Sequence, residues 1–137
     1  MDTHQPTFDG EKVQMIPEIK EALDAVVAAG LGSPSADYEL GGMQLPALVA
    51  SVSGAYLSAA ASMTMGYIGL TNANANLINA HGTEQQKQKW LEPMLTGRFA
   101  GTMAMSEPGA GSSLADLTTS AVPQGDALQN TVVQTEC

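Results

Sequence analysis

Apolar residues recur at helical spacing in three parts of the chain. In the first part, Pro17 suits the opening position of a helix, and the apolar residues that share one face behind it are Ile19, Leu23, Val26 and Val27. Gly30 is typical of the residue that follows a helix C-terminus, because it tolerates a left-handed backbone. The pattern therefore predicts an amphipathic helix that begins at Pro17 and ends at Gly30.

The second part predicts a helix that begins at Pro46 and is broken or ended by Gly66. Its apolar stripe consists of Leu48, Val49, Val52, Tyr56, Ala60 and Met63. Residues 68–80 are ambiguous, since asparagine and alanine alternate there with the period of a strand although both are poor strand formers. The apolar spacing favours a helix, and Asn72, Asn74 and Asn76 are expected to be satisfied inside the bundle or partly exposed rather than to line a polar pocket.

The third part carries a capping box. Thr83 followed by Gln86 predicts a helix start at Glu84, and Gly97 is expected to end that helix. The apolar face of this helix consists of Trp90, Leu91, Met94 and Leu95. Trp90 is interpreted as a core residue rather than a ligand contact.

Beyond Gly97 the pattern becomes extended. The short apolar run 100–105 predicts a buried strand, and residues 117–122 predict a second one. Pro123, Gly125 and Asp126 predict a turn, and a third strand is expected to begin at residues 131–133. With residues 30–46 as a connection, the chain is predicted to be mainly α, with a loose leader (1–15), a helical domain (16–97) and the start of a β domain (98–137).

Composition narrows the classes of partner. The 137 residues carry a net charge of −9 and only five basic side chains, which argues against binding to nucleic acid and to anionic membrane surfaces. No apolar stretch is expected to reach membrane-spanning length. The lone Cys137 allows no internal disulfide, and no secretory signal is visible, so a cytoplasmic location is expected, or the mitochondrial matrix in a eukaryote. His81 has no ligand-type neighbour at helical spacing, so no metal site is predicted.

The chemistry-bearing stretch follows the apolar run. Gly109 and Gly111 leave the backbone bare, and hydroxyl groups flank them at Ser106, Ser112 and Ser113. Such a loop offers N–H and O–H donors to a flat, carbonyl-rich or phosphate-bearing ligand. It lacks the third glycine of a dinucleotide fingerprint and the Gly-Lys-Ser/Thr ending of a nucleotide-triphosphate loop. On spacing alone an ordinary turn is the favoured interpretation, because clusters of Gly, Ser and Pro after strands are usually turns.

Residues 105–116, Met-Ser-Glu-Pro-Gly-Ala-Gly-Ser-Ser-Leu-Ala-Asp, resemble the flavin-loop signature of acyl-CoA dehydrogenases. The segment that begins His81-Gly82-Thr83 resembles the family's last helix before that loop, and Gly42 with Leu45-Pro46 resembles an earlier motif less closely. The likeness spans residues 31–122. Ser113 stands where many members have Asp, a mark of the long-chain subgroup.

The resemblance implies the helical N-terminal domain and the first strands of the middle β-barrel of an FAD-dependent enzyme of fatty-acid β-oxidation. That enzyme removes two hydrogens from the α and β carbons of an acyl-CoA, passes electrons to electron-transfer flavoprotein or another acceptor, and is a homo-oligomer. By position in the motif, Met103, Met105 and Ser106 would face the isoalloxazine ring, and Gly111 and Ser112 would lie at the junction of FAD and acyl-CoA.

The resemblance also implies that the catalytic base lies downstream, in the family's C-terminal domain, and that Glu107 is not that base. No catalytic residue is therefore assigned, and the chain is expected to be a fragment that is inactive alone. Two alternatives stay open: a non-catalytic helical interaction module or remnant, and a fragment of a related acyl-CoA oxidase.

Overall fold

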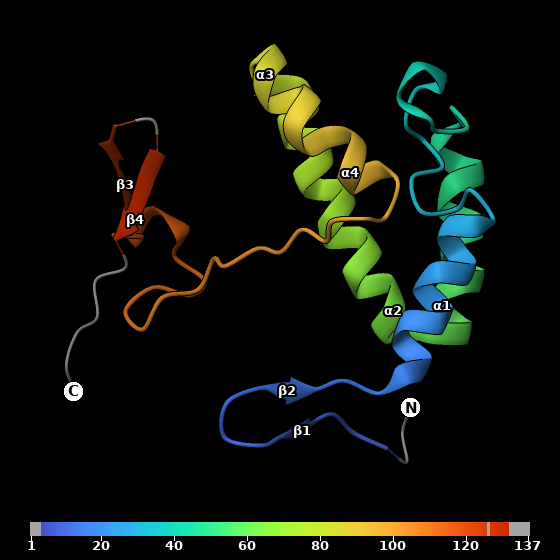
Figure 1. Ribbon diagram of the computed structural model, residues 1–137, viewed down its shortest axis with the longest axis horizontal. Helices are drawn as coiled ribbons and strands as arrows, with labels where there is room; N and C mark the ends of the chain where they lie inside the picture. Colours follow the sequence, from blue (N-terminus) through green and yellow to red (C-terminus); the bar gives the residue numbers. More distant parts are fainter. Residues whose placement is uncertain (1–3, 126, 132–137) are drawn as a thin grey trace. The chain divides into compact units, whose positions relative to one another are not determined.

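The computed structural model describes residues 4–125 and 127–131, and the chain divides into two compact units, residues 1–102 and 103–137 (Figure 1). The first unit holds the long helices. The second holds a loop and a two-stranded hairpin. The mainly helical fold is confirmed, while the finer division into domains stays a prediction.

The first helix, α1 (Pro17–Ala28), forms as its sequence predicts, with Pro at its start. Gly30 adopts a φ of 74° just past its end. The Gly30 N–H donates to Val27 O at 2.9 Å, and the Leu31 N–H donates to Val26 O at 3.0 Å. These two bonds satisfy carbonyl groups that would otherwise lack a donor at the helix end. The prediction that Gly30 ends the helix is therefore confirmed.

The second helix, α2 (Ala47–His81), is 35 residues long and bends into two arms (Figure 1). Pro46 precedes it as the capping residue rather than opening it. The predicted break at Gly66 is wrong, because Gly66 lies inside the helix and the kink falls at Ala61, where φ is −153° and ψ is 69°. An isolated glycine costs a helix only about 1 kcal/mol, so flanking turns can carry the helix through it. The helical interpretation of residues 68–80 is confirmed.

Because Gly66 does not end α2, two predicted segments join into one apolar helix. By length and composition alone, this helix is long enough to cross a membrane, which corrects the expectation that no apolar stretch reaches that length. The core helix of a soluble protein passes the same test. Much of the apolar stripe of its first arm is exposed, with Leu48 and Tyr56 each 77% accessible.

A third helical segment starts at the predicted capping box. The Gln86 N–H donates to Thr83 Oγ1, and the Thr83 N–H donates to Gln86 Oε1 at 2.9 Å. The segment consists of α3 (Glu84–Gln86), a π-helical turn η2 (Lys87–Leu91) and α4 (Glu92–Leu95). Pro93 lacks the N–H that an α-helix would direct to the fourth residue before it, and the wider π turn lies directly ahead of it.

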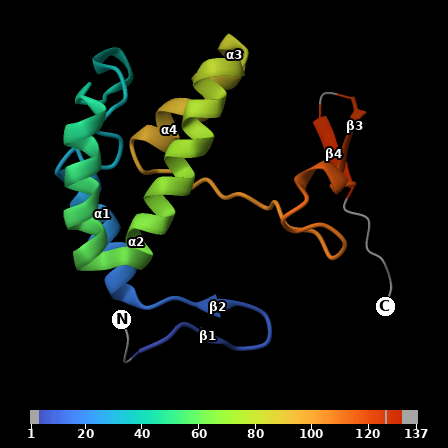
Figure 2. The same cartoon turned by 180° about the vertical axis from the view of Figure 1, so that it is seen from behind.

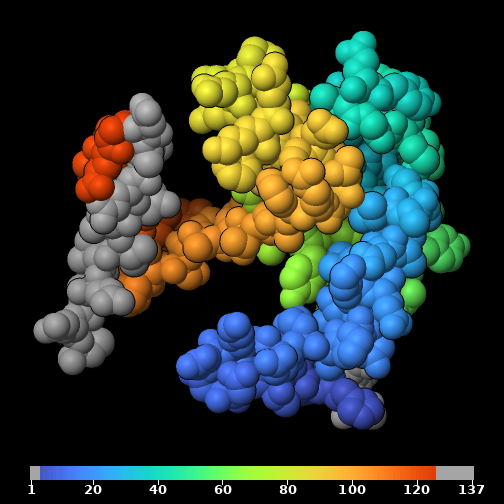
Figure 3. All heavy atoms as spheres, in the orientation of Figure 1, coloured from blue at the N-terminus to red at the C-terminus, as the bar shows by residue number. Residues whose placement is uncertain are grey.

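The core of the helical unit lies where α1 and α4 pack on α2. Figure 2 shows the two arms of α2 from behind, and in Figure 3 the green α2 is visible between the blue α1 and the yellow-to-orange α3–α4 segment. The buried apolar residues of this unit include Ile19, Ile68, Ala75, Leu91 and Pro93. Trp90 is 39% exposed and lies 5.9 Å from the Phe99 ring, so its assignment to the core is wrong.

The first fifteen residues are not a loose leader throughout. Strands β1 (Thr7–Phe8) and β2 (Val13–Gln14) pair antiparallel, with Phe8 opposite Val13. The predicted Asp9-Gly10 turn joins them, because the Asp9 carboxylate accepts from the N–H groups of Glu11 and Lys12 at 2.9 and 2.7 Å. Local side-chain to backbone bonds thus organise a segment that has no apolar periodicity. The connection between α1 and α2 contains a short 3₁₀ helix, η1 (Tyr38–Leu40).

The second unit differs from its prediction in strand positions. Residues 100–105 form no strand, since nothing in the described part of the chain pairs with them. A 3₁₀ helix, η3 (Leu114–Asp116), precedes β3 (Ser120–Gln124), which pairs antiparallel with β4 (Ala127–Thr131). Pro123 therefore lies in a strand instead of the turn, as an edge position allows. The predicted turn residue Asp126 and the rest of the predicted third strand, residues 132–133, lie outside the described residues.

Candidate functional site

The candidate loop begins where α2 holds the extended chain. Thr71 Oγ1 accepts from the Gly101 N–H at 2.9 Å and donates to Tyr67 O at 2.8 Å. One turn further along α2, Asn74 Nδ2 donates to Thr102 O at 3.0 Å. Two helix side chains thus bond successive backbone groups of the segment that leads to the loop, and they fix the position from which it leaves the helical unit.

This close approach requires a glycine. A Cβ atom at Gly101 would lie 2.8 Å from Asn74 Nδ2, closer than real Cβ contacts. Two of the three asparagines are satisfied, as predicted: Asn72 Nδ2 donates to Gly32 O at 2.8 Å, Ser33 Oγ donates to Asn72 Oδ1 at 2.9 Å, and Asn74 is bonded as described above. Asn76 is exposed. Asn72 and Asn74 therefore tie α2 to the segments packed beside it.

The loop itself is organised by Glu107. Its backbone exchanges two hydrogen bonds with Ala110, from Glu107 N–H to Ala110 O at 2.9 Å and from Ala110 N–H to Glu107 O at 3.1 Å. Its Oε2 accepts from the N–H of Thr118 at 2.9 Å and from the hydroxyl of Thr118 at 2.8 Å. Its Oε1 accepts from the N–H of Thr119 at 2.7 Å and also from the Thr119 hydroxyl. Every polar atom of Glu107 therefore has a hydrogen-bond partner within the loop or in the two residues just before β3.

These bonds lower the pKa of Glu107 to about 2 from its ordinary value of 4.5, chiefly through the Thr119 hydroxyl and then the Thr118 N–H. Hydrogen bonds to the charged form of a carboxyl group favour ionisation. A carboxylate of such low basicity, with both oxygens engaged, is a poor proton acceptor. The geometry agrees with the assignment that Glu107 is not a catalytic base.

The five residues predicted to contact a cofactor are all exposed, whereas Ala110, which precedes Gly111, is buried. Met103 is 53% exposed, and Met105 is 45% exposed. Among the described residues, the hydroxyls and the backbone N–H groups of Ser106 and Ser112 find no hydrogen-bond partner, and neither does the Gly111 N–H. A Cβ at Gly111 would meet nothing within 4 Å. The loop thus offers open backbone and unpaired donors, while the roles of these five residues stay predictions.

Two features of this region escaped the sequence patterns. Nothing in the spacing indicates that Thr118 and Thr119 bond a carboxylate eleven and twelve residues before them, because such contacts follow from the path of the loop. The bond between Thr71 and Gly101 was equally unpredictable from the sequence pattern, since the two residues are thirty positions apart. The only available signal was the Thr-Thr pair itself, which supplies two hydroxyl donors side by side.

The helical unit also contains an apolar groove of about 320 Å³. Its lining combines α1, α2 and the segment after α4, with Leu23, Val27, Tyr67, Ile68, Met94 and Phe99 as its larger apolar side chains. Within the described part of the chain, no three His, Cys, Asp or Glu side chains are grouped so that they could hold a metal ion. Polar side chains, among them Asp24, Asn72 and Arg98, complete the lining of this groove.

The chain is similar in sequence and in structure to acyl-CoA dehydrogenases. The sequence profile of the acyl-CoA dehydrogenase N-terminal domain matches residues 4–98. A crystal structure of acyl-CoA dehydrogenase from Geobacillus kaustophilus is 36% identical and superposes with a TM-score of 0.69, over 84% of this chain and 30% of that one.

Two curated relatives extend the likeness in sequence. The 3-methylmercaptopropionyl-CoA dehydrogenase of Ruegeria pomeroyi is 35% identical over 126 residues, which cover 91% of this chain and 21% of the relative. The CarC subunit of the caffeyl-CoA reductase-Etf complex of Acetobacterium woodii is 38% identical over 80 residues, which cover 58% of this chain and 18% of that subunit. The chain spans about a fifth of the length of these two relatives.

Proposed function

This chain belongs to the acyl-CoA dehydrogenase family, whose members are flavin-dependent oxidoreductases, and from that premise we propose that its loop of residues 103–112 contacts the flavin of FAD. The observation that carries the proposal is a set of donors in this loop that have no partner in the described part of the chain: the hydroxyls and N–H groups at Ser106 and Ser112 and the N–H at Gly111. The fixed turn at Glu107 lies between them.

The chemistry of this donor set fits a flavin. The polar edge of an isoalloxazine ring presents ring nitrogens and carbonyl oxygens, which accept hydrogen bonds from O–H and N–H groups. Met103 and Met105 add exposed, polarisable thioethers that pack well against an aromatic face. When bound, FAD supplies the redox chemistry by accepting a hydride; the residues of this chain bind and orient its ring.

The substrate and the electron acceptor are part of the same proposal. We infer that the complete enzyme takes acyl-CoA thioesters and oxidises the bond between their α and β carbons, with Gly111 and Ser112 at the junction of flavin and thioester. The proton acceptor for the α-carbon is expected outside these residues, because the Glu107 carboxylate is fully engaged. Electron-transfer flavoprotein is the proposed acceptor, supported by the Etf complex named for the Acetobacterium relative.

The test is a titration of the purified chain with FAD, followed by flavin fluorescence. We expect saturable binding without turnover when acyl-CoA and a dye acceptor are added. The double variant Ser106→Ala/Ser112→Ala should bind FAD roughly thirtyfold more weakly, since each of the two lost hydrogen bonds contributes about 1 kcal/mol and about 1.4 kcal/mol is tenfold in affinity. Ser58→Ala, an exposed change on α2, is the matched control and should bind as the unmodified chain does.

Two results would count against the proposal. Absence of saturable FAD binding would remove the assigned role of the loop. Equal binding by the double variant and by Ser58→Ala would show that FAD contacts some other surface.

A further inference from the structure

We propose that Glu107 is a positioning residue, whose carboxylate ties the loop closed and thereby orients Ser106 and Gly111 toward the cofactor. This inference rests on the proposed function, because the flavin is the ligand that the loop serves. It assigns Glu107 a role other than proton transfer, and it assigns Thr118 and Thr119 to the loop closure.

The closure is made by charged hydrogen bonds. The two carboxylate oxygens of Glu107 accept from Thr118 at 2.9 and 2.8 Å and from Thr119 at 2.7 Å, with the Thr119 hydroxyl as a fourth donor. Bonds to an ionised acceptor are roughly twice as strong as neutral ones. The carboxylate therefore joins the start of the loop to the residues just before β3.

The backbone of Glu107 forms the second half of the arrangement. Its paired bonds with Ala110, at 2.9 and 3.1 Å, hold the Pro108-Gly109 turn, and Ala110 is itself buried. Ser106 lies directly before this fixed residue, and Gly111 lies directly after the turn. Ser106 and Gly111 are therefore each bonded to a residue whose backbone is held by hydrogen bonds, although their own donors have no partner within the described residues.

Without this closure, residues 107–119 would be a glycine-containing loop with many accessible conformations. Ligand binding would then include the cost of ordering the loop, which lowers affinity.

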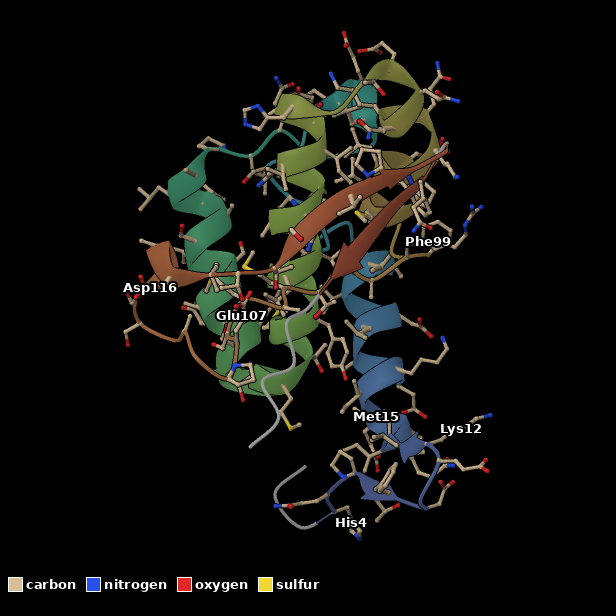
Figure 4. The ribbon with its side chains drawn as sticks, turned by 90° about the vertical axis from the view of Figure 1, so that its left-hand side faces the viewer. His4, Lys12, Met15, Phe99, Glu107 and Asp116 are labelled. Atoms are coloured by element: carbon tan, nitrogen blue, oxygen red, sulfur yellow. The ribbon has the colours of Figure 1, made fainter. Side chains whose placement is uncertain are left out.

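The experiment compares Glu107→Gln with Asp116→Asn. Both changes remove one negative charge from the same loop segment (Figure 4), but no side-chain hydrogen bond of Asp116 is found among the described residues. The glutamine keeps the shape of Glu107 and turns an NH₂ group toward threonine donors. The readouts are the dissociation constant for FAD, the position of the bound flavin absorbance band, and hydrogen exchange of the amides at residues 118–119.

We expect Glu107→Gln to lose amide protection at residues 118–119, to shift the flavin band and to weaken FAD binding roughly tenfold, whereas Asp116→Asn changes affinity less than about twofold. Thr119→Val should weaken binding in the same direction, and Thr119→Ser, which keeps the hydroxyl, should restore it. This rescue separates positioning from a general loss of structure.

Other outcomes are equally decisive. If the unmodified chain binds FAD and Glu107→Gln binds it with equal strength and an unshifted band, the positioning role is refuted while the proposed function stands. If Asp116→Asn weakens binding as much as Glu107→Gln, charge alone explains the effect and the positioning role also fails. If the unmodified chain does not bind FAD, the proposed function and this inference both fail.

Discussion

The same substitution at two threonines of α2 should change stability in opposite directions. Thr71 is 8% exposed, and its hydroxyl accepts from the Gly101 N–H at 2.9 Å and donates to Tyr67 O at 2.8 Å. Thr64 is fully buried, and its hydroxyl oxygen has no hydrogen-bond partner among the residues that the structure describes. Valine has nearly the shape of threonine but carries a methyl group in place of the hydroxyl. Thr71→Val therefore removes two bonds, whereas Thr64→Val removes none.

The magnitudes follow from what each change leaves behind. Thr71→Val leaves the Gly101 N–H without its acceptor, and an unsatisfied buried donor costs about 1–3 kcal/mol. Thr64→Val relieves a hydroxyl that is buried without compensation, which costs about 1–3 kcal/mol in proteins. We expect a loss of about 2 kcal/mol in the free energy of unfolding for Thr71→Val and a gain of about 1 kcal/mol for Thr64→Val.

The assay is urea unfolding followed by far-ultraviolet circular dichroism, which reports the helical unit. With a denaturant slope of about 2 kcal/mol per molar, Thr71→Val should lower the midpoint by about 1 M and Thr64→Val should raise it by about 0.5 M. Hydrogen exchange at Gly101 should accelerate only in Thr71→Val. Equal midpoint shifts in the two variants would refute the assignment of the bond between α2 and the loop segment.

Three further predictions concern packing and charge. Gly101→Ala should lower the free energy of unfolding by about 1–2 kcal/mol in a urea titration, because the new methyl would lie 2.8 Å from Asn74 Nδ2. Gly69→Ala, where a Cβ would meet nothing within 4 Å among the described residues, should raise it by about 0.5–1 kcal/mol through helix propensity. A gain in both variants would contradict the close approach at Gly101. Leu91→Ala should cost about 2–5 kcal/mol, since this side chain is 3% exposed, and Leu91→Met less than about 1.5 kcal/mol, as thermal unfolding would measure. Backbone hydrogen bonds in the first hairpin lower the pKa of Asp9 from 3.8 to about 2, so the ionised Asp9 stabilises the hairpin fully above pH 3.8 and loses this effect as the pH falls through 2. NMR titration of the hairpin amides should give a midpoint near pH 2, and a midpoint near 3.8 would exclude the bonds.

Local sequence rules predicted the helix boundaries best where a specific capping group exists. Gly30 ends α1 with a left-handed backbone, and Thr83 with Gln86 starts α3 by exchanging hydrogen bonds. These signals depend on residues within one turn of each other, so they survive in any tertiary context. The kink at Ala61 had no such signal, because neither Pro nor Gly stands there.

For the candidate site, the sequence identified the loop but not what holds it. The motif around Ser106 and Gly111 was visible from its glycines and hydroxyls, and the family match of residues 4–98 supports the resemblance. The bonds from Glu107 to Thr118 and Thr119 were invisible, because contacts across a loop carry no period.

The sequence by itself determined the mainly helical fold, the ends of α1 and the start of α3, and the family. Each of these depends on short-range pattern: apolar spacing, capping residues and a contiguous motif. Only the tertiary structure decided that α2 continues through Gly66, that Trp90 stays partly exposed and that Thr71 anchors Gly101. The bond between Thr71 and Gly101 joins residues thirty positions apart. Contacts at such separations, like the exposure of a side chain, are set by the path of the folded chain and not by the neighbouring residues in sequence.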